Sequence, residues 1–116
     1  MAVHKCNTIK LDRERPINFG INQTILFCDE FQIDLPEATE LIQKSFTGKS
    51  LKGLVTLIYT ALIDGCRLID QEKDFTKEDV GDWLDYIEAD EMVKILNIYT
   101  KSMPEGEGEK KKTNME

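Results

Sequence analysis

The sequence predicts a mainly α-helical fold: a single-domain bundle of about five helices with a short N-terminal extended segment or β-hairpin. Its 116 residues suit one domain, and a hydrophobic content of 41% is enough for a core. Beyond residue 20, apolar residues recur at the spacing of amphipathic helices. The expected parts are an extended segment or hairpin at 1–20, a helical domain at 21–103 and a disordered tail at 104–116.

The N-terminal segment is predicted to be extended because polar and apolar residues alternate weakly from Cys6 to Leu11. A polar turn at 12–14 follows. Pro16 then disfavours a helix at the residue before it. Strands near 4–11 and 14–19 would form a hairpin, and the alternative is a loosely packed extended arm.

The first helix is expected to begin at an asparagine, because Asn18 and Asn22 are both favoured N-cap residues. It is predicted to run to Phe31. Its apolar stripe, read from helical spacing, comprises Ile21, Ile25 and Cys28 with the neighbouring Leu26 and Phe27.

The second helix is expected to begin at Asp34 or Leu35. Pro36 suits the first helical turn, and Glu37 complements the helix dipole. Gly48 suits the position just after the helix end. Its apolar face comprises Ala38, Leu41, Ile42 and Phe46.

The longest helix is predicted over residues 50–71. Its apolar stripe comprises Leu51, Leu54, Val55, Ile58, Ala61, Leu62, Cys66 and Ile69. Leu57, Ile63 and Leu68 lie off that stripe, so the helix is apolar on more than one side. We expect it to be either central in the bundle or partly covered by another chain.

Two shorter helices are predicted after it. The first begins with a capping-box-like sequence at 76–79, and its buried face comprises Val80, Trp83, Leu84 and Ile87. The second begins at the acidic joint 88–91, and its stripe comprises Met92, Ile95, Leu96, Tyr99 and Met103. Val93 and Ile98 lie to the side of that stripe, and Pro104 ends the ordered part.

The charge balance limits the partners. The chain has 22 acidic against 15 basic residues and a formal net charge of -7. Binding to nucleic acid or to an anionic membrane requires clustered Lys and Arg, so neither is an expected partner. Basic or neutral proteins are the electrostatically favoured partners.

No catalytic or metal-binding constellation is present in the sequence. His4 is the only histidine, and the motifs of nucleophile elbows, phosphate loops and zinc proteases are absent. A zinc site of His4 with the three cysteines would match no compact zinc module. We therefore expect neither an enzyme nor a cofactor. Trp83, the only tryptophan, is expected to be either a packing anchor or an interface hot spot.

Three stretches together resemble a known family. They are INFGIN leading into FCDEF within 17–31, LKGLVTLIYTAL at 51–62 and FTKEDVGDWLD at 75–85. In their order and content, over about residues 8–100, the chain resembles the tail assembly chaperones of long-tailed (siphovirus-like) bacteriophages. The third stretch is the most specific of the three.

The resemblance implies a non-enzymatic role. Such chaperones bind the tape measure protein, keep it soluble and help the tail tube protein to assemble around it, and they self-associate. They act in the host bacterial cytoplasm and are not in the mature virion. Many also have a longer product that is made by ribosomal frameshifting. The candidate region for such an event is Lys110, Lys111 and Lys112. The alternative is that these lysines belong to a tail that only increases solubility.

A holding chaperone needs apolar helix surface beyond its own core. The candidate partner-binding residues are Leu57, Ile63, Leu68, Val93, Ile98 and Trp83. All except Trp83 lie off the predicted stripes, and they could equally be core residues of a bundle with two buried faces. The alternative function is a small acidic regulatory or adaptor protein, such as an inhibitor that mimics nucleic-acid charge.

Overall fold

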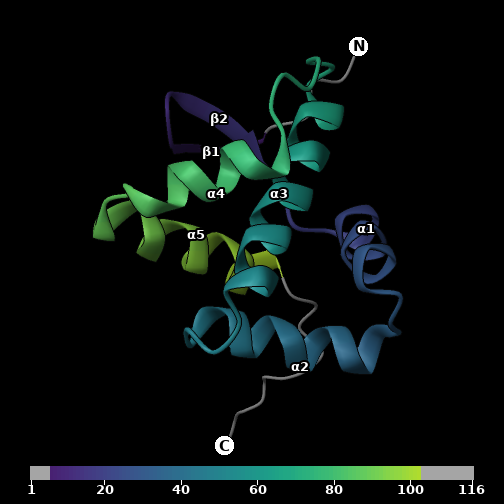
Figure 1. The fold of residues 1–116 in the computed structure, drawn as a ribbon. Helices are drawn as coiled ribbons and strands as arrows, with labels where there is room; N and C mark the ends of the chain where they lie inside the picture. The colour runs from purple at the N-terminus through teal and green to yellow at the C-terminus, as the bar shows by residue number, and fades with distance from the viewer. Residues whose placement is uncertain (1–5, 103–116) are drawn as a thin grey trace, which may run out of the picture.

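The computed structural model describes residues 6–102 and has a two-stranded hairpin followed by five helices (Figure 1). The elements are β1 (Asn7–Lys10), β2 (Glu14–Ile17), α1 (Ile21–Phe31), α2 (Leu35–Phe46), α3 (Leu51–Leu68), α4 (Lys77–Asp85) and α5 (Ala89–Ser102). This confirms the predicted mainly α bundle with an N-terminal hairpin. The predicted tail at 104–116, with Lys110, Lys111 and Lys112, lies outside the described residues, as does His4.

The hairpin is antiparallel, and its register pairs Asn7 with Ile17 and Lys10 with Glu14. Both strands are shorter than predicted. The side chains of Ile9 and Ile17 are fully buried, so the hairpin belongs to the core and is not a loose arm.

Helix α3 is the centre of the bundle (Figure 1). It contacts β2, α1, α2 and α4, and Leu57, Ile58, Ala61 and Leu62 are all fully buried. These contacts decide between the two expectations for this helix: its second apolar side is covered by the chain itself. The helix ends at Leu68, about one turn before the predicted end, and Asp70 then takes a positive φ of 59°.

Two glycines of α3 allow its neighbours to approach closely. A Cβ at Gly65 would overlap the backbone of Pro16 in β2, and a Cβ at Gly53 would overlap the Ser45 hydroxyl of α2. Any larger residue at either position would push these elements apart. The absence of a side chain here therefore serves packing within the chain.

The predicted start and end of α2 and the predicted start of α4 are confirmed, whereas α4 ends at Asp85, so Ile87 lies beyond the helix on which it was predicted. Asp34 and Glu37 form a capping box at α2, and Thr76 and Asp79 form one at α4. Gly48 follows α2 with a φ of 81°, a left-handed conformation that glycine adopts without strain.

The expected cap of α1 is wrong. The N-cap is Gly20, and neither asparagine caps the helix. The Asn18 side-chain amide instead donates to Asp64 Oδ2 at 2.7 Å, and its backbone N–H donates to the Ala61 carbonyl at 3.0 Å. Asn18 therefore ties the end of the hairpin to α3, because Asp64 is a buried carboxyl that needs donors.

The predicted stripe of α1 is also only partly right. Phe27 is buried, but Ile21 and Ile25 point away from the core, and Gln23 takes a buried position. The Gln23 amide donates to the Thr60 hydroxyl of α3 at 3.1 Å. This buried hydrogen bond, together with Phe27, fixes the rotation of α1 and turns its isoleucines outward.

Candidate partner-binding surface

The six predicted partner-binding residues do not form one surface. Leu57 is 0% exposed, so its assignment as surplus surface is corrected: it is a core residue. Of the other five, three pack partly buried against the core, namely Ile63, Trp83 and Ile98, and Leu68 is half-buried at the end of α3. Val93 is the only one of the six that is largely exposed, at 56%.

Trp83 packs within the chain. The Arg15 guanidinium lies 4.3 Å from the centroid of the Trp83 ring, and Phe75 lies against the same ring with centroids 6.0 Å apart. Cation–π contacts of this kind stabilise a desolvated arginine. Trp83 therefore connects α4 to the hairpin, as expected of a packing anchor.

Arg15 is held by two carboxylates as well as by these rings. Its Nε atom lies 2.5 Å from Asp12, and its Nη1 atom lies 2.8 Å from Asp74. Hydrogen bonds from Arg15 hold the pKa values of Asp12 and Asp74 below the usual range, because they favour the charged carboxylate. Three separate segments meet at this buried cation, and the cluster is structural.

The most exposed apolar side chains near one another in sequence lie on α1. Ile21 is 81% exposed and Ile25 is 51% exposed, one helical turn apart on the same face. We call this pair the α1 ridge. It follows directly from the rotation of α1 that the Gln23–Thr60 hydrogen bond sets.

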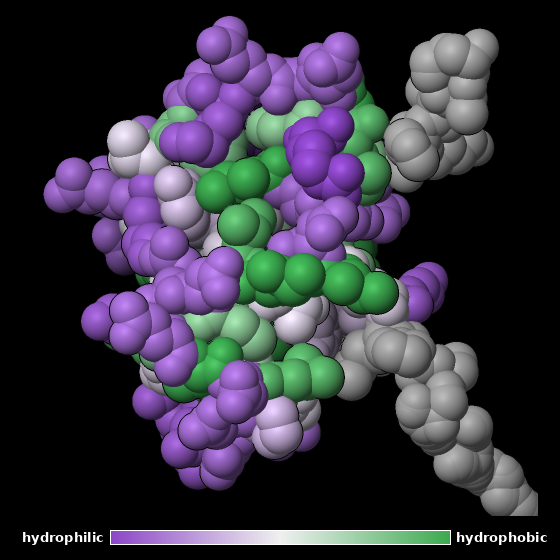
Figure 2. Space-filling model, turned by 90° about the vertical axis from the view of Figure 1, so that its right-hand side faces the viewer, coloured by the Kyte–Doolittle hydropathy of each residue, from purple (hydrophilic) through white to green (hydrophobic). Residues whose placement is uncertain are grey.

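The side of the molecule on which α1 lies also carries other apolar surface. Figure 2 views the molecule from the side on which α1 lies in Figure 1, and apolar side chains form a band over this face, interrupted by polar groups. Leu35, at the N-terminal end of α2, is 61% exposed and adds to the exposed apolar surface of the two helices.

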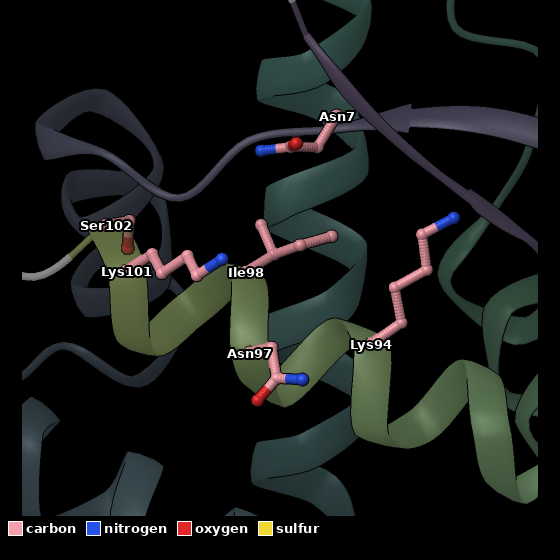
Figure 3. A pocket seen from close by; sticks show the side chains of 6 residues that line it. All are labelled: Asn7, Lys94, Asn97, Ile98, Lys101 and Ser102. Carbon is pink, nitrogen blue, oxygen red and sulfur yellow. The ribbon is translucent and has the colours of Figure 1, made fainter.

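A second, weaker apolar row lies along α5. Val93 and Leu96 are exposed on its outer face, while Ile95 on the inner face is fully buried. Ile98 lies beside a cleft of about 360 Å³ between α5 and β1. Figure 3 shows its side chain pointing towards Asn7, with Lys94 and Lys101 on either side.

A larger groove of about 620 Å³ lies between α3 and α4. Its lining residues are Lys52, Val55, Thr56, Lys77, Glu78, Gly81, Asp82 and Asp85. Thr56 is fully buried, and its hydroxyl has no hydrogen-bond partner within residues 6–102. The groove is thus mixed in character, with a floor of short side chains and charged rims.

Burial raises the pKa of the Cys6, Cys28 and Cys66 thiols, so they are weak nucleophiles at neutral pH. Residues 6–102 hold no group of three or more side chains placed to bind a metal ion. Over the same residues, no helix combines the length and apolar character needed to cross a membrane.

Comparison of the chain with protein-family models, curated proteins and solved structures finds no match.

Sequence reasoning named Ile21 and Ile25 as core residues and so missed the α1 ridge. The helix carries two apolar sides, one formed by Phe27 and Phe31 and the other by the two isoleucines. A helix that is apolar on two sides needs a neighbour on each side to bury both of them. The second apolar side of α1 was therefore the sequence signal that could have indicated the exposed isoleucines.

Proposed function

We propose that this chain is a non-enzymatic holding chaperone that covers an apolar helix of a partner protein. The observation that carries the proposal is the α1 ridge, where an isoleucine that is 81% exposed lies one turn from another that is 51% exposed. Each would lose contact with water on docking, and burial of a large aliphatic side chain contributes about 1.5–3 kcal/mol.

The exterior suits a protein that must remain in solution while it presents an apolar face. The chain carries a net charge of -7, and most of its acidic side chains are exposed. Net charge opposes self-aggregation through exposed apolar groups. A holding protein needs this combination, because its apolar surface must engage the partner and not cause precipitation.

The partner we propose is the tape measure protein, on the resemblance of the chain to phage tail assembly chaperones. By the same resemblance, the tail tube protein is a second partner and the chain self-associates. It acts in the host bacterial cytoplasm and is absent from the mature virion. The tape measure protein is long and helical in these phages, so it would offer the apolar helices that the α1 ridge is suited to cover.

The test is co-expression with the tape measure protein of the same phage or prophage. The wild-type chain should keep that protein soluble and co-purify with it. A double variant, Ile21→Asp with Ile25→Asp, should lose both effects, because it places charges on the α1 ridge. Circular dichroism should show unchanged helicity, since both side chains are already exposed.

The matched control is Val93→Asp with Leu96→Asp, which makes the same chemical change on the exposed apolar row of α5. This control should retain solubilisation and co-purification. If the wild-type chain neither co-purifies with the tape measure protein nor raises its solubility, the proposal fails. If both double variants lose binding equally, the α1 ridge is not the site.

A further inference from the structure

Gly81 lies in the middle of α4, where the folded chain gives no reason for the absence of a side chain. A Cβ built at this position meets no atom within 4 Å. Gly53 and Gly65, in contrast, are closely covered by α2 and β2. Glycine weakens a helix interior relative to alanine, so Gly81 carries a cost that packing within residues 6–102 does not offset.

The open side of Gly81 faces the groove between α3 and α4. Val55 and Thr56 of α3 line the opposite side of this groove, whose volume is about 620 Å³. A floor of small and β-branched side chains allows another backbone to come close, as small residues do at tight helix–helix contacts. The groove is therefore shaped for an approaching chain more than for a compact small molecule.

The charges around the groove are unequal. Glu78, Asp82 and Asp85 follow one another at i, i+4 and i+7 along α4, and none of them has an ion-pair partner within the described part of the chain. Of the two lysines of the rim, Lys77 pairs with Glu30, whereas Lys52 is exposed and has no ion-pair partner within the described residues, so three unpaired carboxylates face one unpaired ammonium. The uncompensated charge is therefore negative.

We propose that this groove binds a basic amphipathic helix of the partner protein, with a small residue over Gly81 and Lys or Arg residues facing the acidic row of α4. The inference rests on the proposed function, in that it assigns a second contact to the same partner. Helix α4 has nine residues and is about 13 Å long, so two to three turns of a docked helix can align with it. A helix in a groove is a common mode of peptide recognition.

The groove can be tested without the tape measure protein. The probe is a synthetic amphipathic helical peptide with an alanine row and lysines at i, i+4 and i+7. The control peptide has glutamates in place of these lysines. On titration into the isotope-labelled full chain, the lysine peptide should shift the amide resonances of Val55 and Gly81, and the glutamate peptide should leave them in place.

Two variants and one control locate the contact. Gly81→Leu should abolish peptide binding and leave the fold intact, because its side chain enters open space in the free chain. Asp82→Lys with Asp85→Lys should weaken binding about tenfold or more. Asp90→Lys, an exposed acidic residue of α5 outside the groove, should weaken it less than about twofold.

Three results would overturn the proposal: equal shifts with both peptides, full binding by Gly81→Leu, or shifts confined to α1. These results are separate from the test of the proposed function. A chain whose groove binds the lysine peptide but which fails to solubilise the tape measure protein would leave the groove assignment in place and remove its assigned partner.

Discussion

Helices α3 and α1 are both apolar on two sides, yet the fold treats them in opposite ways. The middle of α3 is covered on its apolar sides, because β2, α1, α2 and α4 surround it, and of its predicted apolar stripe only Leu51 at its start and Ile69 just after its end are exposed. Helix α1 has fewer neighbours and leaves Ile21 and Ile25 in solvent. Apolar residues on two sides of a helix therefore do not show by themselves whether both sides are buried, because this depends on the arrangement of the neighbouring elements.

The largest expected effect separates the two helices by stability. Leu57→Ala should lower the free energy of unfolding by about 3 kcal/mol, because it opens a cavity against fully buried neighbours. Ile21→Ala should change it by less than about 0.5 kcal/mol, since the side chain is exposed. Urea denaturation measures both. An equal decrease in the free energy of unfolding for both variants would place Ile21 in the core and contradict the difference between α3 and α1.

The next effect tests what holds the hairpin against α4. Arg15→Ala should lower the free energy of unfolding by about 2 kcal/mol, because it removes a buried cation from Asp12, Asp74 and the Trp83 ring. Arg13→Ala is the control, since that arginine also pairs with Asp74 but both side chains are half exposed. Urea denaturation of the two variants should rank them in this order, and a reversed order would contradict the account.

A smaller effect is expected in the pH dependence of the free energy of unfolding. The pKa of Asp12 is lower in the folded chain than in the unfolded chain. Its ion pair with Arg15 therefore stabilises the fold fully when the pH is above the unfolded-state pKa, and this stabilisation is lost as the pH falls through the folded-state pKa. The free energy of unfolding should therefore decrease below about pH 4. Asp12→Asn should reduce this decrease. A titration with the same slope in the variant would show that the ion pair contributes nothing.

The smallest effect concerns the groove side of α3. Thr56→Val replaces an unpaired buried hydroxyl with a methyl group of similar shape. The free energy of unfolding should stay unchanged or rise by up to about 1 kcal/mol. Thr60→Val is the contrast. Its hydroxyl accepts a hydrogen bond from Gln23, so this substitution should lower the free energy of unfolding. Destabilisation by Thr56→Val in a thermal melt would mean that its hydroxyl has a partner.

Features that depend on neighbouring residues could be predicted from the sequence, whereas features that depend on contacts between distant residues could not. The capping residues of α2 and α4 and the left-handed Gly48 act within a few residues, so the sequence located these helix ends. The rotation of α1 depends on Gln23 meeting Thr60, two residues on different helices. A polar residue in a core position defeats a prediction that counts only apolar spacing.

The candidate site was missed for the same reason. Of the predicted residues, Leu57 proved to be core because α3 is surrounded, which no pattern within α3 could reveal. The pairing of Arg15 with Trp83 likewise joins segments distant in sequence. The general expectation of surplus apolar helix surface came from the sequence, whereas its place on α1 came only from the fold.

The most direct test of the central claim is methyl NMR of the isoleucine-labelled chain on addition of the tape measure protein. We expect the δ1 methyl signals of Ile21 and Ile25 to shift or broaden first. Those of the buried Ile58 and Ile95 should stay in place. Unchanged Ile21 and Ile25 signals, in a sample where the tape measure protein is bound, would contradict the claim that the α1 ridge is the binding surface.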